Sequence, residues 1–139
     1  MKKISVILSV LFFVLIIGCE AQQIKSVSEV NKLKVIEKTF VNKPLKDLLK
    51  EIGPEIKMAT ANPSNNSNSR LGYFTFRFID AKRYDSLQRK DIYSKQITVF
   101  VKESFDWDSR SKDRKKWTNA EAEKYGNLTV VGIRVFGEE

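Results

Sequence analysis

The sequence predicts an α+β fold: a single domain with a mainly antiparallel β-sheet of about four to five strands and two short helices on one face. Residues 71–80 alternate phenylalanine with other side chains at the period of a strand, and residues 45–52 repeat apolar side chains at the period of a helix. The expected order is strand, helix, several strands, helix, strand. Strands that follow one another in a run, rather than alternating with helices, are typical of an antiparallel sheet in an α+β domain.

The domain is expected to begin with a strand and a helix. Residues 33–41 are rich in β-branched and aromatic side chains and predict a strand. Apolar side chains at positions 45, 48, 49 and 52 then follow the i, i+3, i+4, i+7 spacing of a helix. Asn42 can cap this helix, Pro44 suits its first turn, and Gly53 with Pro54 ends it. One face of the helix must be buried.

Two strands separated by a polar loop are expected in the middle of the chain. Residues 55–60 predict a short strand, and the Asn- and Ser-rich residues 61–70 predict the loop. In the strand at 71–80, the period of two places Phe74, Phe76 and Phe78 on one face, which we expect to lie in the core. The opposite face carries Tyr73, Thr75, Arg77 and Ile79.

Residues 81–91 are a polar connection that can carry a helical turn. Residues 92–102 predict the next strand, with Ile97, Val99 and Val101 on one face. A connection of this length permits the strands at 71–80 and 92–102 to pair as antiparallel neighbours.

A short helix and a strand are expected at the end of the chain. Residues 118–121, Thr-Asn-Ala-Glu, form a capping box that begins the helix, and Gly126 ends it. Residues 127–136 predict the last strand, with apolar positions 131, 133 and 135 (Val131, Ile133, Val135) on one face. Arg134 and Phe136 are expected on one sheet face with Arg77 and Tyr73. That face is either a binding surface or covered by a helix.

The first eighteen residues have the anatomy of an export signal. Lys2 and Lys3 form a basic start, and Val6–Ile17 is an apolar run interrupted only by Ser9. The run is too short for a transmembrane helix, which needs about 20 apolar residues. The chain is therefore expected to be exported.

The end of this segment, Ile16-Ile17-Gly18-Cys19, resembles the lipobox of bacterial lipoproteins. The resemblance covers only the signal. It implies that cleavage falls before Cys19, that the Cys19 thiol carries diacylglycerol, and that the new amino terminus is held in a membrane leaflet of the bacterial cell envelope. The alternative is an ordinary secretory cleavage after Ala21, which would release a soluble periplasmic or secreted protein.

Three regions are expected along the chain. Residues 1–18 are the lipoprotein signal peptide, residues 19–32 a polar lipidated tether without a clear period, and residues 33–139 the globular α+β domain.

The composition limits the possible chemistry. The chain contains no histidine and a single cysteine, Cys19. Serine–histidine and cysteine–histidine nucleophilic pairs are therefore excluded, and so is the commonest zinc ligand. Asp106 and Asp108 have the spacing of calcium ligands, but Arg110 follows where a third oxygen ligand is needed. We expect no metal site and no cofactor.

The 25 basic and 17 acidic side chains give a net charge of +8 at pH 7. A moderate positive excess favours anionic surfaces, such as lipid head groups, acidic polysaccharide or an acidic protein. Nucleic acid is not expected as a partner, because the chain carries no motif for it and an exported domain rarely meets it.

The segment 103–117 is the candidate partner-binding region, because it combines aromatic rings with a cluster of basic side chains. Trp107 and Trp117 are the expected anchors. The charge is supplied by Lys112, Arg114, Lys115 and Lys116. The alternative is a solvated loop whose tryptophans pack on the edge of its own core.

The sequence therefore predicts a small exported lipoprotein, anchored to the membrane through Cys19, that acts as a non-catalytic binding or scaffolding domain. Its partner would be a protein, anionic lipid or acidic polysaccharide. Two alternatives remain open. One is an inhibitor or immunity-type lipoprotein that blocks one enzyme, and the other is a histidine-free hydrolase that uses carboxylates such as Asp106 and Asp108.

Overall fold

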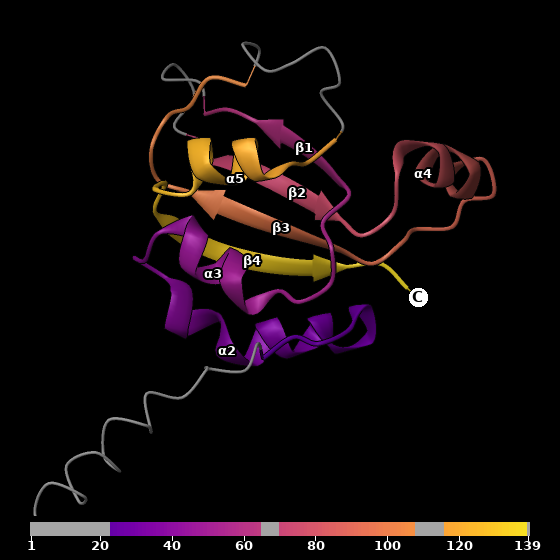
Figure 1. Ribbon diagram of the computed structural model, residues 1–139, viewed down its shortest axis with the longest axis horizontal. Coiled ribbons are helices and arrows are strands. Elements are labelled where there is room, and N and C mark those ends of the chain that lie inside the picture. Colours follow the sequence, from indigo (N-terminus) through magenta and orange to yellow (C-terminus); the bar gives the residue numbers. More distant parts are fainter. Residues whose placement is uncertain (1–22, 65–69, 108–115, 139) are drawn as a thin grey trace, which may run out of the picture.

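The computed structural model describes residues 23–64, 70–107 and 116–138. These residues form one α+β domain on a four-stranded antiparallel sheet in the order β1-β2-β3-β4, which confirms the expected fold class (Figure 1). The strands are β1 (Met58–Asn62), β2 (Gly72–Arg77), β3 (Gln96–Val101) and β4 (Val130–Phe136). The helices are the 3₁₀-helix η1 (Val27–Lys32) and the α-helices α2 (Leu33–Phe40), α3 (Leu45–Glu51), α4 (Ala81–Gln88) and α5 (Asn119–Tyr125). The described residues therefore contain more helices than the two expected.

Strands β2 and β3 form the centre of the sheet. Phe74 lies opposite Val99 and Phe76 opposite Ile97, and all four side chains are fully buried. Phe78, just after β2, is buried as well. The predicted antiparallel pairing and the predicted core face are both confirmed.

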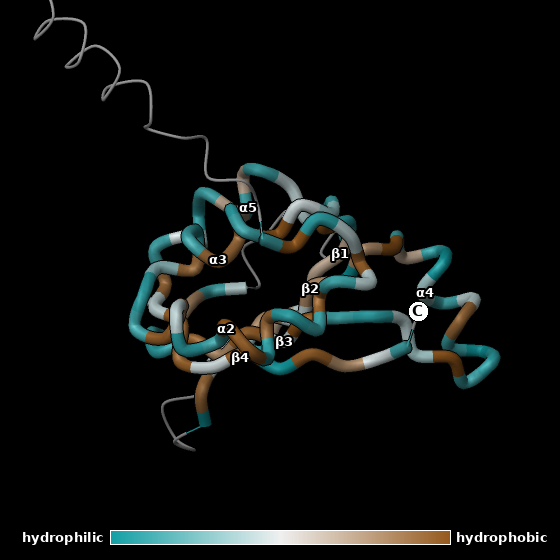
Figure 2. The backbone as a smooth tube through the Cα atoms, turned by 90° about the horizontal axis from the view of Figure 1, so that it is seen from below, coloured by the Kyte–Doolittle hydropathy of each residue, from teal (hydrophilic) through white to brown (hydrophobic). Residues whose placement is uncertain are grey.

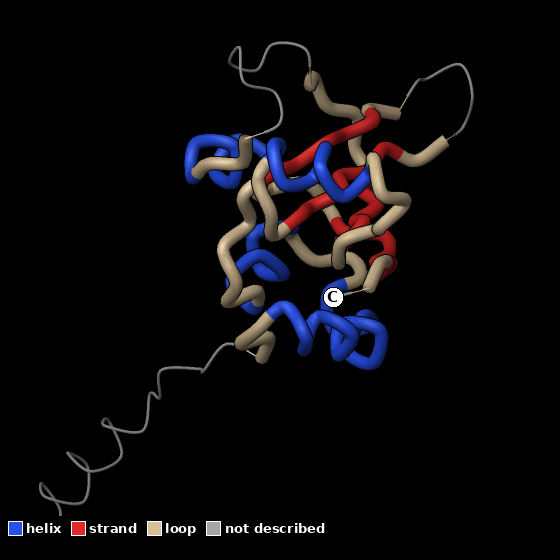
Figure 3. The backbone as a smooth tube through the Cα atoms, turned by 90° about the vertical axis from the view of Figure 1, so that its right-hand side faces the viewer, coloured by secondary structure: helices blue, strands red, loops and turns tan. Residues whose placement is uncertain are grey.

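The helices are distributed unequally around the sheet. Helices α3 and α5 lie over one face, while α2 lies beside the β4 edge (Figures 1 and 2). Leu45 and Leu48 of α3 and Tyr125 of α5 join the core beneath this layer. Of the described helices, only α4 reaches the opposite face, where Tyr84 covers Arg77 at the end of β2. The rest of that face carries no helix from the described residues (Figure 3).

Residues 33–40 form helix α2, so the prediction of a first strand at 33–41 is wrong. Leu33 and Phe40, seven residues apart on one face of the helix, are buried in the core. On the same side, the Glu37 carboxylate accepts a hydrogen bond of 2.9 Å from the Ile133 backbone N–H in β4. An edge strand exposes unpaired N–H and C=O groups, and α2 covers those of β4. This packing outweighs the β-propensity of the segment.

Helix α3 is confirmed close to its predicted bounds, but Asn42 does not cap it. Asn42 adopts a left-handed φ of 64°, and its N–H donates to the Val130 carbonyl at 2.8 Å. Pro44 occupies the N-cap position instead. At α5 the predicted capping box is confirmed, with the Thr118 N–H donating to the Glu121 carboxylate at 2.9 Å.

Strand β4 departs from strict alternation. Its buried side chains are Val130, Ile133 and Val135. Val101 pairs with Val130 and Phe100 with Gly132, so Val131 is an extra residue in the ladder. Such a bulge shifts the alternation of side chains by one residue. Val131 is therefore not buried with Ile133 and Val135, the two residues with which it was expected to share a face, and Val130 is buried with them instead.

Residues 23–32 belong to the folded domain. The prediction of a polar tether over residues 19–32 is therefore wrong for residues 23–32. Ile24 is fully buried and forms an isolated parallel bridge with Ile52. Its N–H donates to the Glu51 carbonyl at 3.1 Å, and its carbonyl accepts from the Gly53 N–H at 2.7 Å. Val30 of η1 is also fully buried. Ile24, Val27 and Val30 recur every third residue, a spacing that differs from the i, i+3, i+4, i+7 pattern of an α-helix, so the search for helical periodicity did not reveal this packing.

Candidate binding surface

The two tryptophans of the segment 103–117 lie in the core. Trp107 and Trp117 are only 8% and 9% exposed. Trp107 packs edge-on against Phe74, with ring centroids 5.6 Å apart, and Trp117 packs edge-on against Phe76 at 4.9 Å. Buried rings cannot act as the exposed anchors that the sequence predicted. The alternative, that both rings pack on their own domain, is confirmed.

The predicted basic cluster is described only at one end. Lys112, Arg114 and Lys115 lie outside the described residues. Lys116 is exposed and pairs with Met58 in an isolated antiparallel bridge.

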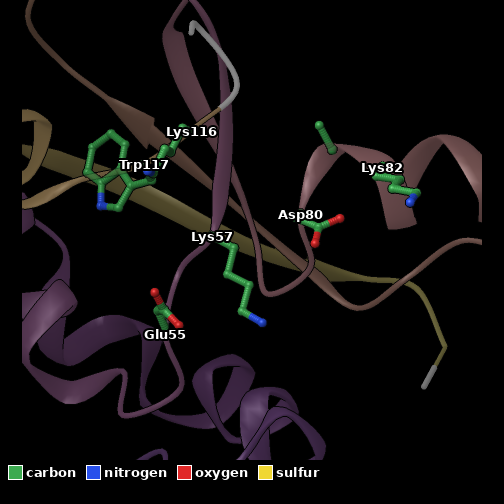
Figure 4. Close-up of a pocket in the computed structure, with 7 residues that line it drawn as sticks. Glu55, Lys57, Asp80, Lys82, Lys116 and Trp117 are labelled. Atoms are coloured by element: carbon green, nitrogen blue, oxygen red, sulfur yellow. The ribbon is translucent and has the colours of Figure 1, made fainter.

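Lys116 also borders a cavity of about 400 Å³ (Figure 4). Lys57 and Lys82 line the same cavity, but so do Glu55 and Asp80. Asp80 already accepts a hydrogen bond of 2.8 Å from the Arg83 N–H at the start of α4. The mixed signs of charge do not define one class of ligand.

Glu103, also in this segment, connects the end of β3 to the start of β4. Its carboxylate accepts hydrogen bonds from the Thr129 N–H, at 2.6 Å, and from the Thr129 hydroxyl. Partial burial alone would raise the pKa of Glu103. The Thr129 hydrogen bonds outweigh this effect and hold the pKa below its ordinary value of 4.5.

Replacing Glu103 with glutamine is expected to make the domain less sensitive to acid. A carboxyl with a lowered folded-state pKa stabilises the fold above its unfolded pKa, and this contribution is lost as the pH falls through the folded pKa. Because Glu103 is largely exposed, we expect a change below about 1 kcal/mol. Urea unfolding from about pH 7 to about pH 3 should show a shallower loss of stability for Glu103→Gln than for the wild type. Glu55→Gln, at another exposed carboxylate, is the control, and equal slopes for both variants would contradict the prediction.

The sheet face opposite α3 and α5 carries aromatic and arginine side chains. The strand register places Arg77, Arg134, Tyr73 and Phe136 on this face, as predicted. The Tyr73 and Phe100 rings lie 5.7 Å apart, and the Arg134 guanidinium lies 5.2 Å from the centre of the Phe100 ring. We call this surface the open face.

Arg77 makes one end of the open face rigid. Its Nε donates to the Gln96 side-chain oxygen at 2.8 Å, and a terminal guanidinium nitrogen donates to the Thr60 hydroxyl at 3.1 Å. The guanidinium also lies 4.5 Å from the centre of the Tyr84 ring. Burial lowers the pKa of Arg77, and the nearby Tyr84 opposes this shift. Arg77 therefore supports its neighbours rather than presenting a charge to a ligand.

A mainly apolar hollow of about 640 Å³ lies beside this end of the open face, and its lining also includes Asp91, Gln96, Gly137 and Glu138. Ile92, Tyr93 and Phe136 line it and are 44%, 64% and 47% exposed. These are three of the five large exposed hydrophobic side chains among the described residues; the other two are Val35 and Leu71. Apolar side chains gathered around one hollow are characteristic of a binding surface, whereas scattered ones are not. We call this site the Tyr93–Phe136 hollow.

Hydrogen bonds to backbone carbonyls hold the walls of the hollow together. The Glu138 N–H donates to the Tyr93 carbonyl at 2.9 Å, and the Lys95 ammonium donates to the Gly137 carbonyl at 2.9 Å. Gly137 has a φ of 89°, and a Cβ atom there would lie 2.1 Å from the Ser94 carbonyl oxygen. Only glycine fits this close approach. The hollow is therefore preformed, which lowers the entropic cost of binding.

Sequence reasoning missed this hollow because its walls come from two separate segments. Tyr93 lies in the connection between α4 and β3, and Phe136 ends β4. Neither residue belongs to a local motif. The expectation that Phe136 shares the face of Arg77 was the one available signal, and it located the face without the hollow.

Of the two carboxylates considered for a cation site or for hydrolysis, only Asp106 belongs to the described residues. Asp106 is exposed, and its backbone carbonyl accepts a 2.7 Å hydrogen bond from the Tyr125 hydroxyl. Asp108 lies outside the described residues. Within residues 23–64, 70–107 and 116–138, no group of three or more acidic or cysteine side chains is placed to hold a metal ion.

Comparisons with known proteins identify no relative. No protein-family model, curated protein or solved structure matches the chain. None of the helices in the described ranges is both long and apolar enough to cross a membrane. The function is therefore inferred from the sequence, the open face and the Tyr93–Phe136 hollow.

Proposed function

We propose that this chain is a lipid-anchored, non-catalytic binding domain of a bacterial cell envelope, and that it contacts a protein partner through the Tyr93–Phe136 hollow. The observation that carries the proposal is the preformed apolar hollow with its three exposed side chains. The N-terminal export signal and the lipobox-like residues ending at Cys19 support the anchor and the location.

The partner expected at the hollow presents an apolar side chain, because Asp91 and Glu138 in the lining disfavour a carboxylate inside it. A tyrosine and a phenylalanine around a hollow provide large contact areas with little loss of side-chain entropy. Arg89 and Lys90 are exposed in the same connection as Tyr93, and Arg134 is exposed on the open face. These cations favour approach of an acidic surface, and so does the net charge of +6 (23 basic and 17 acidic side chains) that remains once Lys2 and Lys3 leave with the signal peptide.

Replacing Phe136 with alanine is expected to weaken partner binding by at least about thirtyfold in Kd, since truncating an aromatic hot-spot residue costs about 2 kcal/mol or more. The partner is first captured in intact envelopes by a photo-crosslinking amino acid at position 92, on the wall of the hollow. Binding of the captured protein to wild-type protein and to the variant is then compared.

Leu71→Ala is the matched control, because Leu71 is 46% exposed, close to the 47% of Phe136, and does not line the hollow. Equal loss of binding in both variants, or no discrete protein captured from position 92, would refute the proposed contact. A single, tight, stoichiometric complex with one enzyme would assign the domain to the inhibitor or immunity type.

A further inference from the structure

We infer that the exposed face of helix α2 lies against an anionic lipid bilayer, so that the β4 edge of the sheet faces the membrane. The inference depends on the proposed acylation of Cys19. Three features of the described structure carry it: where the folded chain begins, which side chains α2 exposes, and where the open face lies.

The folded domain begins very close to the proposed anchor. The Gln23 N–H donates to the Glu51 carboxylate at 3.2 Å, and Ile24 is buried and paired with Ile52. From Cys19 to Gln23 the chain can extend over only about 14 Å, at about 3.6 Å per residue. The part of the domain nearest to Gln23 must therefore lie near the membrane surface. Figures 1 and 3 show the start of the described chain on the same side of the molecule as α2.

Helix α2 exposes lysines and one apolar side chain on its outer face. Lys34, Lys38 and Val35 are all exposed, and Val35 is 85% exposed. At 100° per residue these three side chains lie about 100–160° around the helix from the buried Leu33 and Phe40. A surface of this composition suits the interface of an anionic bilayer, where lysines meet head groups and a small apolar side chain can enter the boundary.

The two acidic side chains near this face are directed elsewhere. The Glu29 carboxylate pairs with Lys32 at 2.8 Å, and the Glu37 carboxylate accepts from the Ile133 N–H in β4. Among the described residues, neither Lys34 nor Lys38 forms an ion pair. The outer face of α2 is therefore left with uncompensated positive charge.

This orientation leaves the proposed partner site accessible. Because α2 lies beside β4 and the strand order is β1-β2-β3-β4, the β1 edge would point away from the membrane (Figure 1). The open face would then stand roughly upright on the bilayer. A partner could reach the Tyr93–Phe136 hollow without displacing the domain from the lipid.

The test uses the full-length protein, processed in a bacterium, purified, and reconstituted into vesicles of phosphatidylglycerol and phosphatidylcholine. Mass spectrometry first establishes whether Cys19 is acylated. A nitroxide at position 35 (Val35→Cys) is then compared with one at exposed position 60 on the β1 edge (Thr60→Cys). Position 35 should be protected from a water-soluble nickel chelate and accessible to oxygen, whereas position 60 should remain accessible to the nickel chelate.

Neutralising the lysines of α2 gives the test a quantitative measurement. Each lysine near an anionic surface contributes about fivefold to binding, so Lys34→Gln with Lys38→Gln should lower the ratio of membrane-contacting to free domain by about 25-fold. Lys82→Gln with Arg83→Gln, the same charge change at exposed positions in α4, should leave it unchanged. Vesicles of phosphatidylcholine alone should abolish most of the contact.

The outcomes separate the inference from the proposed anchor. Acylated protein with positions 35 and 60 equally accessible to nickel would overturn the inference while the anchor stands. Protein without acyl chains would overturn both. Protection of position 35 in the absence of vesicles would show that a protein surface covers α2, and would also overturn it.

Discussion

Replacing Phe74 with alanine is expected to lower the free energy of unfolding by about 3–5 kcal/mol, the usual cost of removing a buried phenylalanine ring. Phe74 is fully buried at the centre of β2. Five rings surround it, with centroids between 4.5 and 6.1 Å away: Phe76, Phe105, Trp107, Trp117 and Tyr125. These rings come from separate segments held by backbone hydrogen bonds, so the cavity cannot close by a small shift. A loss of this size is a large part of the stability of a small domain.

Urea unfolding followed by tryptophan fluorescence measures this loss, because Trp107 and Trp117 border the site. Phe136→Ala is the matched control, since it removes the same atoms from a side chain that is 47% exposed. We expect the control to change the free energy of unfolding by less than about 1 kcal/mol. If the two variants lost equal stability, the aromatic cluster around Phe74 would not be the centre of the core.

Replacing Ile24 with alanine is expected to lower the free energy of unfolding by about 2–5 kcal/mol. Ile24 is fully buried, and its backbone is hydrogen-bonded to Glu51 and Gly53 on both sides. The alanine variant leaves a cavity between the first residues of the domain and α3. Chemical denaturation of the purified protein measures the difference.

Lys25→Ala, at the adjacent exposed position, should stay within about 0.5 kcal/mol of the wild type. If Ile24→Ala changed the free energy of unfolding as little as Lys25→Ala, residues 23–32 would behave as the polar tether that the sequence predicted. The length of free chain available between Cys19 and the domain would then increase, and the anchor would no longer hold α2 close to the membrane.

The two proposed surfaces have different physical characters. The outer face of α2 is basic, so its attraction to anionic lipid should weaken as ionic strength rises. The Tyr93–Phe136 hollow is apolar and preformed, so binding there should depend on contact area and shape. Salt therefore provides a simple way to separate membrane contact from partner contact.

Elements with a local side-chain pattern could be predicted from the amino-acid sequence alone. The alternation of Phe74, Phe76 and Phe78 predicted β2 and its buried face, and leucines at helical spacing predicted α3. The capping box at Thr118 predicted the start of α5. In each case the residues that define the element lie within a few positions of one another, so periodicity and capping are sufficient.

The pairs of surfaces that cover one another could not be predicted from local patterns. Residues 33–40 have the composition of a strand, yet they form α2 because a helix there covers the edge of β4. Ile24 is buried because Ile52, distant in sequence, lies beside it. The tryptophans fill the core rather than serving a partner, and the Tyr93–Phe136 hollow exists because two separate segments end side by side. These features depend on contacts between residues far apart in the chain, and local side-chain patterns carry no record of such contacts.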